Sequence, residues 1–204
     1  MIRYLALGDS YTIGEGVGER GRWPLQLAEA LRREGFAIAD PHIIATTGWT
    51  TSELSAAIDG EEPLGTHWGL VTLLIGVNNQ YRGEHIDDYR REFAALLDRA
   101  IACADGHAAR VLVPSIPDWG VTLYAQREER DARRIASEID AFNSAAHAVC
   151  DNRGVTFINI TTISRRYGAD ADMLAADGLH PSAAMYGLWT GLILPVVRER
   201  LHNG

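Results

Sequence analysis

The chain has 204 residues, of which 47% are hydrophobic and 23% are charged, which is the composition of an ordinary globular protein. This length favours one domain, and we expect residues 1–204 to form it. The 19 basic residues are outnumbered by 27 acidic ones, so the net charge of −8 argues against nucleic acid or an anionic membrane as a partner. A small-molecule substrate is the expected partner.

Every basic residue is Arg, and the absence of Lys excludes a Walker A loop, a Schiff-base lysine and a Ser-Lys dyad. Cys103 and Cys150 lie in segments of helical periodicity, which favours reduced thiols over a disulfide, although a bridge between them stays open. The apolar stretch Leu188–Val197 is far too short to span a membrane, and the N-terminus enters a predicted strand without a signal peptide. We therefore expect a cytoplasmic protein.

Short apolar runs alternate with longer segments of helical periodicity along the chain. The runs predicted as strands are residues 2–7, 43–45, 70–75, 111–113 and 155–160. The segments predicted as helices with one buried face are residues 86–101, 135–149 and 185–197. A mixed-charge run at residues 127–134 is predicted to begin a helix. This alternation predicts an α/β fold, a three-layer α/β/α sandwich of flavodoxin-like type with a five-stranded parallel sheet.

Polar residues and glycines follow these strands at the sheet edge where ligands bind in open parallel sheets. Ser10 comes after the first strand, Gly48 after the second and Asn78 after the third, while Asp177 and His180 precede the last helix. Each has a simple structural interpretation when taken alone, such as a helix cap or a turn. Together they supply a hydroxyl nucleophile, an imidazole base, a carboxylate and oxyanion donors, which is the equipment for acyl transfer.

These residues carry a resemblance to a known family. The sequence resembles the SGNH hydrolases, the GDSL esterase/lipase family, whose four blocks supply Ser, Gly, Asn and His in this order. The resemblance spans residues 5–182 and implies that Ser10 is the nucleophile, His180 the general base and Asp177 its orienting partner. It also implies that the Ser10 N–H, the Gly48 N–H and the Asn78 side-chain amide bind the oxyanion.

Two positions depart from the family pattern. Tyr11 stands where the namesake motif has Leu, and Asn79 stands where the third block usually has Asp. Neither position has a catalytic role in the family, so the departures bear on loop packing and substrate preference. Asp9 is adjacent to Ser10, but neighbouring side chains on an extended segment point apart, so we interpret it as structural. The histidines show no paired metal-ligand spacing, and neither a metal nor another cofactor is expected.

Apolar and aromatic residues near these positions are candidates for binding the substrate: Trp49, Tyr81, Trp119 and Leu179. No connecting segment is long enough to predict a separate lid, and an open crevice favours short acyl groups, from acetyl to about butyryl. The alternatives within the family are a lysophospholipase or thioesterase and a carbohydrate acetylesterase.

A dinucleotide-binding protein is the alternative from another class. Residues 16–21 match G-x-G-x-x-G, and Asp40 follows at about the right distance. However, Gly8–Glu15 separate this motif from the preceding strand, whereas the dinucleotide motif follows its strand directly. We instead predict that these glycines form a mobile loop over the site.

Overall fold

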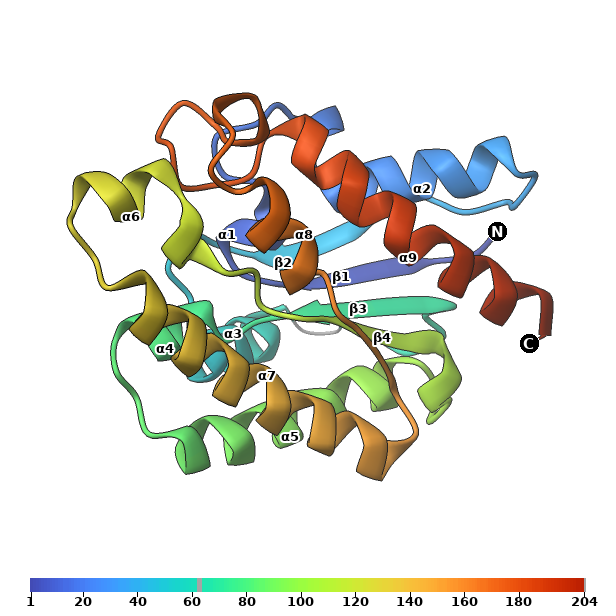
Figure 1. Ribbon diagram of the computed structural model, residues 1–204. Helices are drawn as coiled ribbons and strands as arrows, with labels where there is room; N and C mark the ends of the chain where they lie inside the picture. Colours follow the sequence, from blue (N-terminus) through green and yellow to red (C-terminus); the bar gives the residue numbers. More distant parts are fainter. Residues whose placement is uncertain (62–63, 204) are drawn as a thin grey trace.

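The computed structural model describes residues 1–61 and 64–203. Within them, five parallel strands form one sheet in the order β2-β1-β3-β4-β5 (Figure 1). The strands are β1 (Tyr4–Gly8), β2 (His42–Ala45), β3 (Leu70–Leu74), β4 (Val111–Pro114) and β5 (Thr156–Ile158). The predicted α/β fold with a five-stranded parallel sheet is confirmed, and each strand overlaps the apolar run that predicts it.

The central strands β1 and β3 are mostly apolar because helices cover both faces of the sheet, and the polar Thr72 of β3 lies buried against the Tyr4 hydroxyl. Every residue of β1 and of β3 is buried. The two strands pair in parallel, with Leu7 opposite Leu73 and Gly8 opposite Leu74. Their carboxyl ends therefore finish at the same level.

Helices follow each strand. The α-helices are α1 (Ser10–Ile13), α2 (Trp23–Arg33), α3 (Thr51–Gly60), α4 (Val77–Tyr81), α5 (Ile86–Cys103), α6 (Leu123–Arg127), α7 (Ala132–Arg153), α8 (Thr161–Tyr167) and α9 (Ala183–Asn203). The 3-10 helices are η1 (Glu19–Gly21), η2 (Ala108–Arg110), η3 (Trp119–Val121) and η4 (Ala171–Met173).

The long helices form the two outer layers. Helices α2 and α9 lie against one face of the sheet, and α5 and α7 lie against the other (Figure 1). Trp23 of α2 and Trp189 of α9 are fully buried, as is Tyr89 of α5. The three predicted helical segments are confirmed as parts of α5, α7 and α9. Most of the periodic apolar residues of these helices are buried, which is why the pattern is visible in the sequence, whereas Leu188 and Leu192 of α9 are exposed.

The charged run at residues 127–134 differs from its prediction, since it does not begin one helix. It holds the end of α6 at Arg127, a turn, and the start of α7 at Ala132. Glu129 has a positive φ of 50°, which breaks the helix. The Asp131 side chain then accepts hydrogen bonds from the N–H groups of the next helix's first turn.

The strand order places a crevice beside β1. The chain passes from β1 to β2 on one side and then to β3 on the other, so the switch in direction lies between β1 and β3. Ligands bind outside the carboxyl ends of the strands at such a point. Helices α1 and α4, which follow these two strands, lie at the same end of the sheet (Figure 1).

Cys103 and Cys150 are free thiols, as the sequence predicts. None of the helices built by residues 1–61 and 64–203 combines the length and apolar character that crossing a membrane requires.

Candidate active site

Ser10 lies at the turn from β1 into α1. Asp9 is the N-cap of α1, and its Oδ1 accepts a hydrogen bond of 3.0 Å from the Tyr11 N–H. A Cβ atom on Gly8 would lie 2.2 Å from Oγ1 of Thr12, so only glycine lets the end of β1 approach α1 this closely. Ser10 is 4% exposed, and its chain neighbours Asp9 and Tyr11 are both buried.

Asp9 is fully buried within this turn. Burial raises the pKa of its carboxyl to about 7, and the hydrogen bond from the Tyr11 N–H only partly opposes that effect. Its Oδ2 has no hydrogen-bond partner within the part of the chain that the structure describes. Asp9 therefore caps the helix that carries Ser10, in agreement with the structural interpretation from the sequence.

Asp177 and His180 form a compact turn before α9. Nδ1 of His180 lies 2.6 Å from Oδ2 of Asp177. Oδ1 of Asp177 accepts hydrogen bonds from the N–H groups of Leu179, at 2.8 Å, and of His180, at 3.0 Å. The Asp-x-x-His spacing thus folds the carboxylate back onto the imidazole. Such a contact fixes the imidazole tautomer and its orientation.

The carboxyl of Asp177 is ionised at neutral pH. Partial burial raises its pKa, but the hydrogen bonds from His180 and from the two backbone N–H groups outweigh that effect and leave the pKa below its usual value. Arg127 of α6 donates a 2.7 Å hydrogen bond to the Asp177 carbonyl, and the Tyr124 N–H donates one of 2.8 Å to the Gly178 carbonyl. Helix α6 therefore holds this turn from outside.

Tyr11 packs between the imidazole and the core. Its ring centroid lies 5.8 Å from that of His180 and 6.1 Å from that of Trp189. Tyr11 is 3% exposed. The first departure from the family pattern thus places a large ring against the imidazole that the pattern assigns as the base.

Gly48 and Asn78 come from the segments after β2 and β3. Gly48 has a φ of 89°, in the left-handed region that favours glycine. The Asn78 side-chain amide donates a 2.9 Å hydrogen bond to the Trp49 carbonyl. Since an amide NH₂ has two donors, this bond orients the group and leaves its second N–H for a ligand.

Asn79, the second departure, is fully buried beneath this segment. Its Oδ1 accepts a 3.1 Å hydrogen bond from the Thr51 N–H, and its Nδ2 donates at 2.7 Å to both Thr51 Oγ1 and Glu84 Oε2. An Asp here would lose the donor and set its carboxylate against that of Glu84. The amide is therefore matched to the glutamate beside it.

A pocket of about 180 Å³ brings most of the predicted site residues together. Its lining residues are Ser10, Tyr11, Thr47, Gly48, Val77, Asn78, Tyr81, Trp119, Tyr124, Leu179 and His180. Asp177 lies behind His180. Sequence reasoning missed four of these residues. Tyr11, Thr47 and Val77 adjoin predicted site residues in the chain, whereas nothing in the sequence links Tyr124 to the site.

Trp49 is not among the residues that line this pocket. Its indole is half-buried and packs against the hydrophobic core, and only its backbone carbonyl meets the site, through Asn78. The expectation that the Trp49 side chain walls the substrate pocket is therefore corrected. Proximity to Gly48 in the sequence does not fix the direction of the next side chain, because the left-handed glycine turns the chain.

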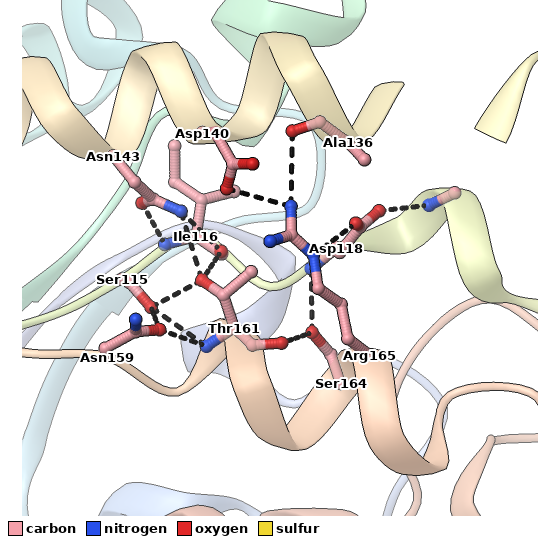
Figure 2. A network of polar contacts seen from close by, with 11 residues as sticks. Ser115, Ile116, Asp118, Ala136, Asp140, Asn143, Asn159, Thr161, Ser164 and Arg165 are labelled. Carbon is pink, nitrogen blue, oxygen red and sulfur yellow. Dashed lines mark hydrogen bonds and ion pairs between the residues drawn. The ribbon is translucent and has the colours of Figure 1, made fainter. Parts of the chain in front are cut away.

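Trp119 lines the pocket, and polar contacts hold both its indole and the residue before it. The indole N–H donates a 2.9 Å hydrogen bond to Gln80 Oε1. Asp118, one residue earlier, is buried and forms a 2.8 Å ion pair with Arg165 of α8. Figure 2 shows the Arg165 guanidinium between Asp118 and Asp140 of α7. The wall on this side is therefore fixed to two helices.

The glycine-rich segment at residues 16–21 packs away from the pocket, and no residue of this segment lines it. A Cβ on Gly16 would lie 2.7 Å from that of Ala175, and one on Gly21 would lie 3.1 Å from that of Ala183. These contacts place the segment against the chain on either side of the Asp177 turn. The prediction of a loop over the site is wrong, because the segment lines no part of the pocket and Gly16 and Gly21 serve close packing.

A larger cavity of about 530 Å³ lies between α7 and the segment joining α4 to α5. It shares Tyr81 with the smaller pocket but has none of Ser10, Gly48, Asn78 and His180 in its lining. Size therefore does not identify the site, and we assign the site to the smaller pocket because the residues predicted as nucleophile, base and oxyanion donors line it together.

Comparison with known proteins identifies a family. Residues 6–188 match the profile of the GDSL-like lipase/acylhydrolase family. A search of the curated proteins found no match.

Several solved structures share the fold. TesA is 21% identical, with 97% of this chain and 99% of TesA covered and a TM-score of 0.73. The lipase/acylhydrolase from Enterococcus faecalis is 20% identical, with 98% and 97% covered and a TM-score of 0.75. The psychrotrophic esterase EstA from Pseudoalteromonas sp. is 17% identical, with 99% and 100% covered and a TM-score of 0.71.

Proposed function

Since the chain belongs to the GDSL-like lipase/acylhydrolase family and is a carboxylic ester hydrolase, we propose that it cleaves short-chain esters through an acyl-enzyme on Ser10. The observation that carries this proposal is the convergence of Ser10, Gly48, Asn78 and His180 on one pocket. The ionised Asp177 on Nδ1 of His180 supports the assignment of the base.

The chemistry follows from these positions. With Asp177 accepting a hydrogen bond from Nδ1–H of His180, the Nε2 atom is free to take the proton of Ser10 as its Oγ attacks the ester carbonyl. The imidazolium then protonates the leaving alcohol. Water then attacks the carbonyl of the acyl-enzyme while His180 takes its proton, which releases the carboxylic acid and returns the proton to Ser10.

The negative oxygen of each tetrahedral intermediate needs donors that are already in place. The Ser10 N–H lies in the first turn of α1, where backbone N–H groups have no acceptor within the helix. The Gly48 N–H and the second amide N–H of Asn78 complete the set. Because these donors converge where charge develops, they favour the intermediate over the planar ester.

The size of the pocket supports a short acyl group. Its volume of about 180 Å³ is below the ~300 to 1,000 Å³ of sites for drug-sized ligands. Tyr81, Trp119 and Tyr124 stand in its wall, and the buried network behind Trp119 opposes expansion. Each further methylene gains about 0.8 kcal/mol only if it is buried. We expect kcat/KM to rise from acetyl to about butyryl and then stop rising.

A series of p-nitrophenyl esters from two to sixteen carbons tests this proposal, with acyl-CoA, lysophospholipid and acetylated sugars assayed beside it. Labelling by a fluorophosphonate, located by mass, tests Ser10 as the nucleophile. A kcat/KM that keeps rising beyond eight carbons would contradict the short-chain assignment and favour the lysophospholipase or thioesterase alternative.

A cytoplasmic location is also part of the proposal. The free thiols of Cys103 and Cys150 support it, because disulfides are rare in reducing compartments. Fractionation of the source cells tests it.

A further inference from the structure

The turn that carries Gly48 is attached to α4 by side chains from that helix and its C-cap. Arg82, the C-cap residue, donates a 2.7 Å hydrogen bond from Nη2 to the Gly48 carbonyl. Asn78 donates to the carbonyl of the next residue, Trp49. Two consecutive carbonyls of the turn are thus bound by residues four positions apart on α4, which lie on one helix face.

Arg82 is itself held in place. Its backbone N–H donates a 3.0 Å hydrogen bond to the Asn78 carbonyl. Its Nη1 lies 3.3 Å from Oε1 of Glu53, the residue whose Oε2 accepts a 2.8 Å hydrogen bond from the Thr50 N–H in the capping box of α3. The guanidinium therefore spans α4, the Gly48 turn and the start of α3.

We propose that Arg82 is a positioning residue of the oxyanion hole, which sets the direction of the Gly48 N–H relative to the Asn78 amide. The inference rests on the proposed function, in which both groups bind the oxyanion. Glycine has more backbone freedom than any other residue, and Gly48 has a positive φ. A 3.3 Å hydrogen bond from the Trp49 N–H to the Thr46 carbonyl closes the turn around Gly48. The bond from Arg82 to the Gly48 carbonyl adds a second restraint, on the peptide that follows Gly48.

This role is separable from folding because Arg82 lies at the surface. Its side chain is 47% exposed, and that of Glu53 is 43% exposed. Exposed ion pairs contribute little to stability. The position of the oxyanion donors matters far more for the rate, since a displacement of about 1 Å in a catalytic group can lower a rate by ~10²-fold. Loss of Arg82 should therefore lower the rate far more than it lowers stability.

The experiment replaces Arg82 with Met and measures hydrolysis of p-nitrophenyl acetate. We expect kcat to fall by about 10- to 100-fold, less than the ~10²- to 10³-fold loss of a donor itself, with KM nearly unchanged. Arg82→Lys retains the charge but cannot bind Gly48 and Glu53 with one planar group. Its kcat should therefore lie between those of the wild type and of Arg82→Met. Arg90→Met is the matched control, because Arg90 is 53% exposed and, among the residues that the structure describes, pairs only with Asp87 of its own helix.

Three results would overturn the proposal: wild-type kcat in Arg82→Met, a change confined to KM, or an equal loss in Arg90→Met. If Arg82→Met does not fold, Glu53→Gln replaces it, because Gln retains an acceptor for the Thr50 N–H and removes the charge that holds Arg82. For Glu53→Gln, a fall in kcat smaller than that expected for Arg82→Met supports the proposal, and an unchanged kcat overturns it. Failure of the proposed function itself would appear separately, as full turnover in Ser10→Ala.

Discussion

Ser10 and His180 reach the same pocket from two turns that are held in different ways. The turn from β1 to α1 is buried: Ser10 is 4% exposed and Asp9 is fully buried. The turn before α9 lies at the surface, where the Asp177 side chain is 42% exposed and hydrogen bonds hold the backbone. Core packing fixes the proposed nucleophile, whereas local hydrogen bonds fix the proposed base. Substitutions that disturb the backbone of the first turn should thus affect stability, and substitutions that disturb the backbone of the second should affect the rate.

The largest expected effect removes either reacting group. Ser10→Ala and His180→Ala should each lower kcat by roughly 10⁴- to 10⁶-fold, because residues of a triad act as one unit. Both variants should fold, since each change removes only a side chain that faces the pocket. Initial rates on p-nitrophenyl acetate and thermal unfolding check this. Turnover near the wild-type rate in either purified variant would contradict the assignment.

Asn78→Ala should have the next largest effect. Loss of an oxyanion donor lowers kcat by ~10²- to 10³-fold with a smaller change in KM. The substitution also removes the hydrogen bond to the Trp49 carbonyl. This variant therefore tests the pocket and not either of the two turns. Steady-state kinetics separate the two constants, and a pure KM effect would mean that Asn78 only binds substrate.

Gly8→Ala tests the buried turn by packing alone. The new Cβ would lie 2.2 Å from Thr12 Oγ1 and 2.5 Å from the Leu74 carbonyl, so backbone must move. We expect the free energy of unfolding to fall by about 2 to 4 kcal/mol. Gly18→Ala is the matched control, because a Cβ there has no neighbour within 4 Å. Equal stability of the two variants in urea would contradict this view of the turn.

Asp9→Asn tests the buried turn by charge. The folded-state pKa of about 7 lies above the usual value, so the folded protein binds the proton more strongly than the unfolded chain does. The wild type should therefore lose stability as pH rises towards 7, by at most about 1.4 kcal/mol for each pH unit. Asn retains the cap acceptor for the Tyr11 N–H and cannot ionise.

The difference in unfolding free energy, variant minus wild type, should thus increase from pH 4.5 to pH 7 and then level off. Urea unfolding at pH 4.5, 6 and 8 measures it. A difference that is constant with pH would show that the Asp9 carboxyl does not titrate in this window.

Arg127→Met tests the exposed turn and should have the smallest effect. It removes the hydrogen bond to the Asp177 carbonyl but leaves the contact between the carboxylate and His180. We expect kcat to fall about 3- to 10-fold through a looser base, as small displacements of catalytic groups lower rates. The urea midpoint should change little, since the lost bond lies at the surface. A large loss of stability with unchanged kcat would contradict the view that this turn positions His180 without contributing much to stability.

Much of the fold was predictable because its signals are local. Helix α5 repeats its apolar residues every three or four positions, and β1 and β3 are apolar apart from Thr72, so burial on one or both faces is visible in the sequence. The boundary between α6 and α7 was not predictable in the same way. Mixed charges at helical spacing fit a helix, and only the positive φ at Glu129 and the cap at Asp131 end that pattern.

The sequence by itself determined the α/β fold, the family, and the positions of Ser10, Gly48, Asn78, Asp177 and His180 along the chain. These follow from periodicity and from short motifs at strand ends, which do not depend on distant contacts. Tertiary structure alone decided that Trp49 packs against the core, that Tyr124 lines the pocket and that Arg82 binds the Gly48 carbonyl. Each of these depends on the direction in which a side chain leaves a turn and on a partner far away in the sequence, and neither is encoded in local spacing.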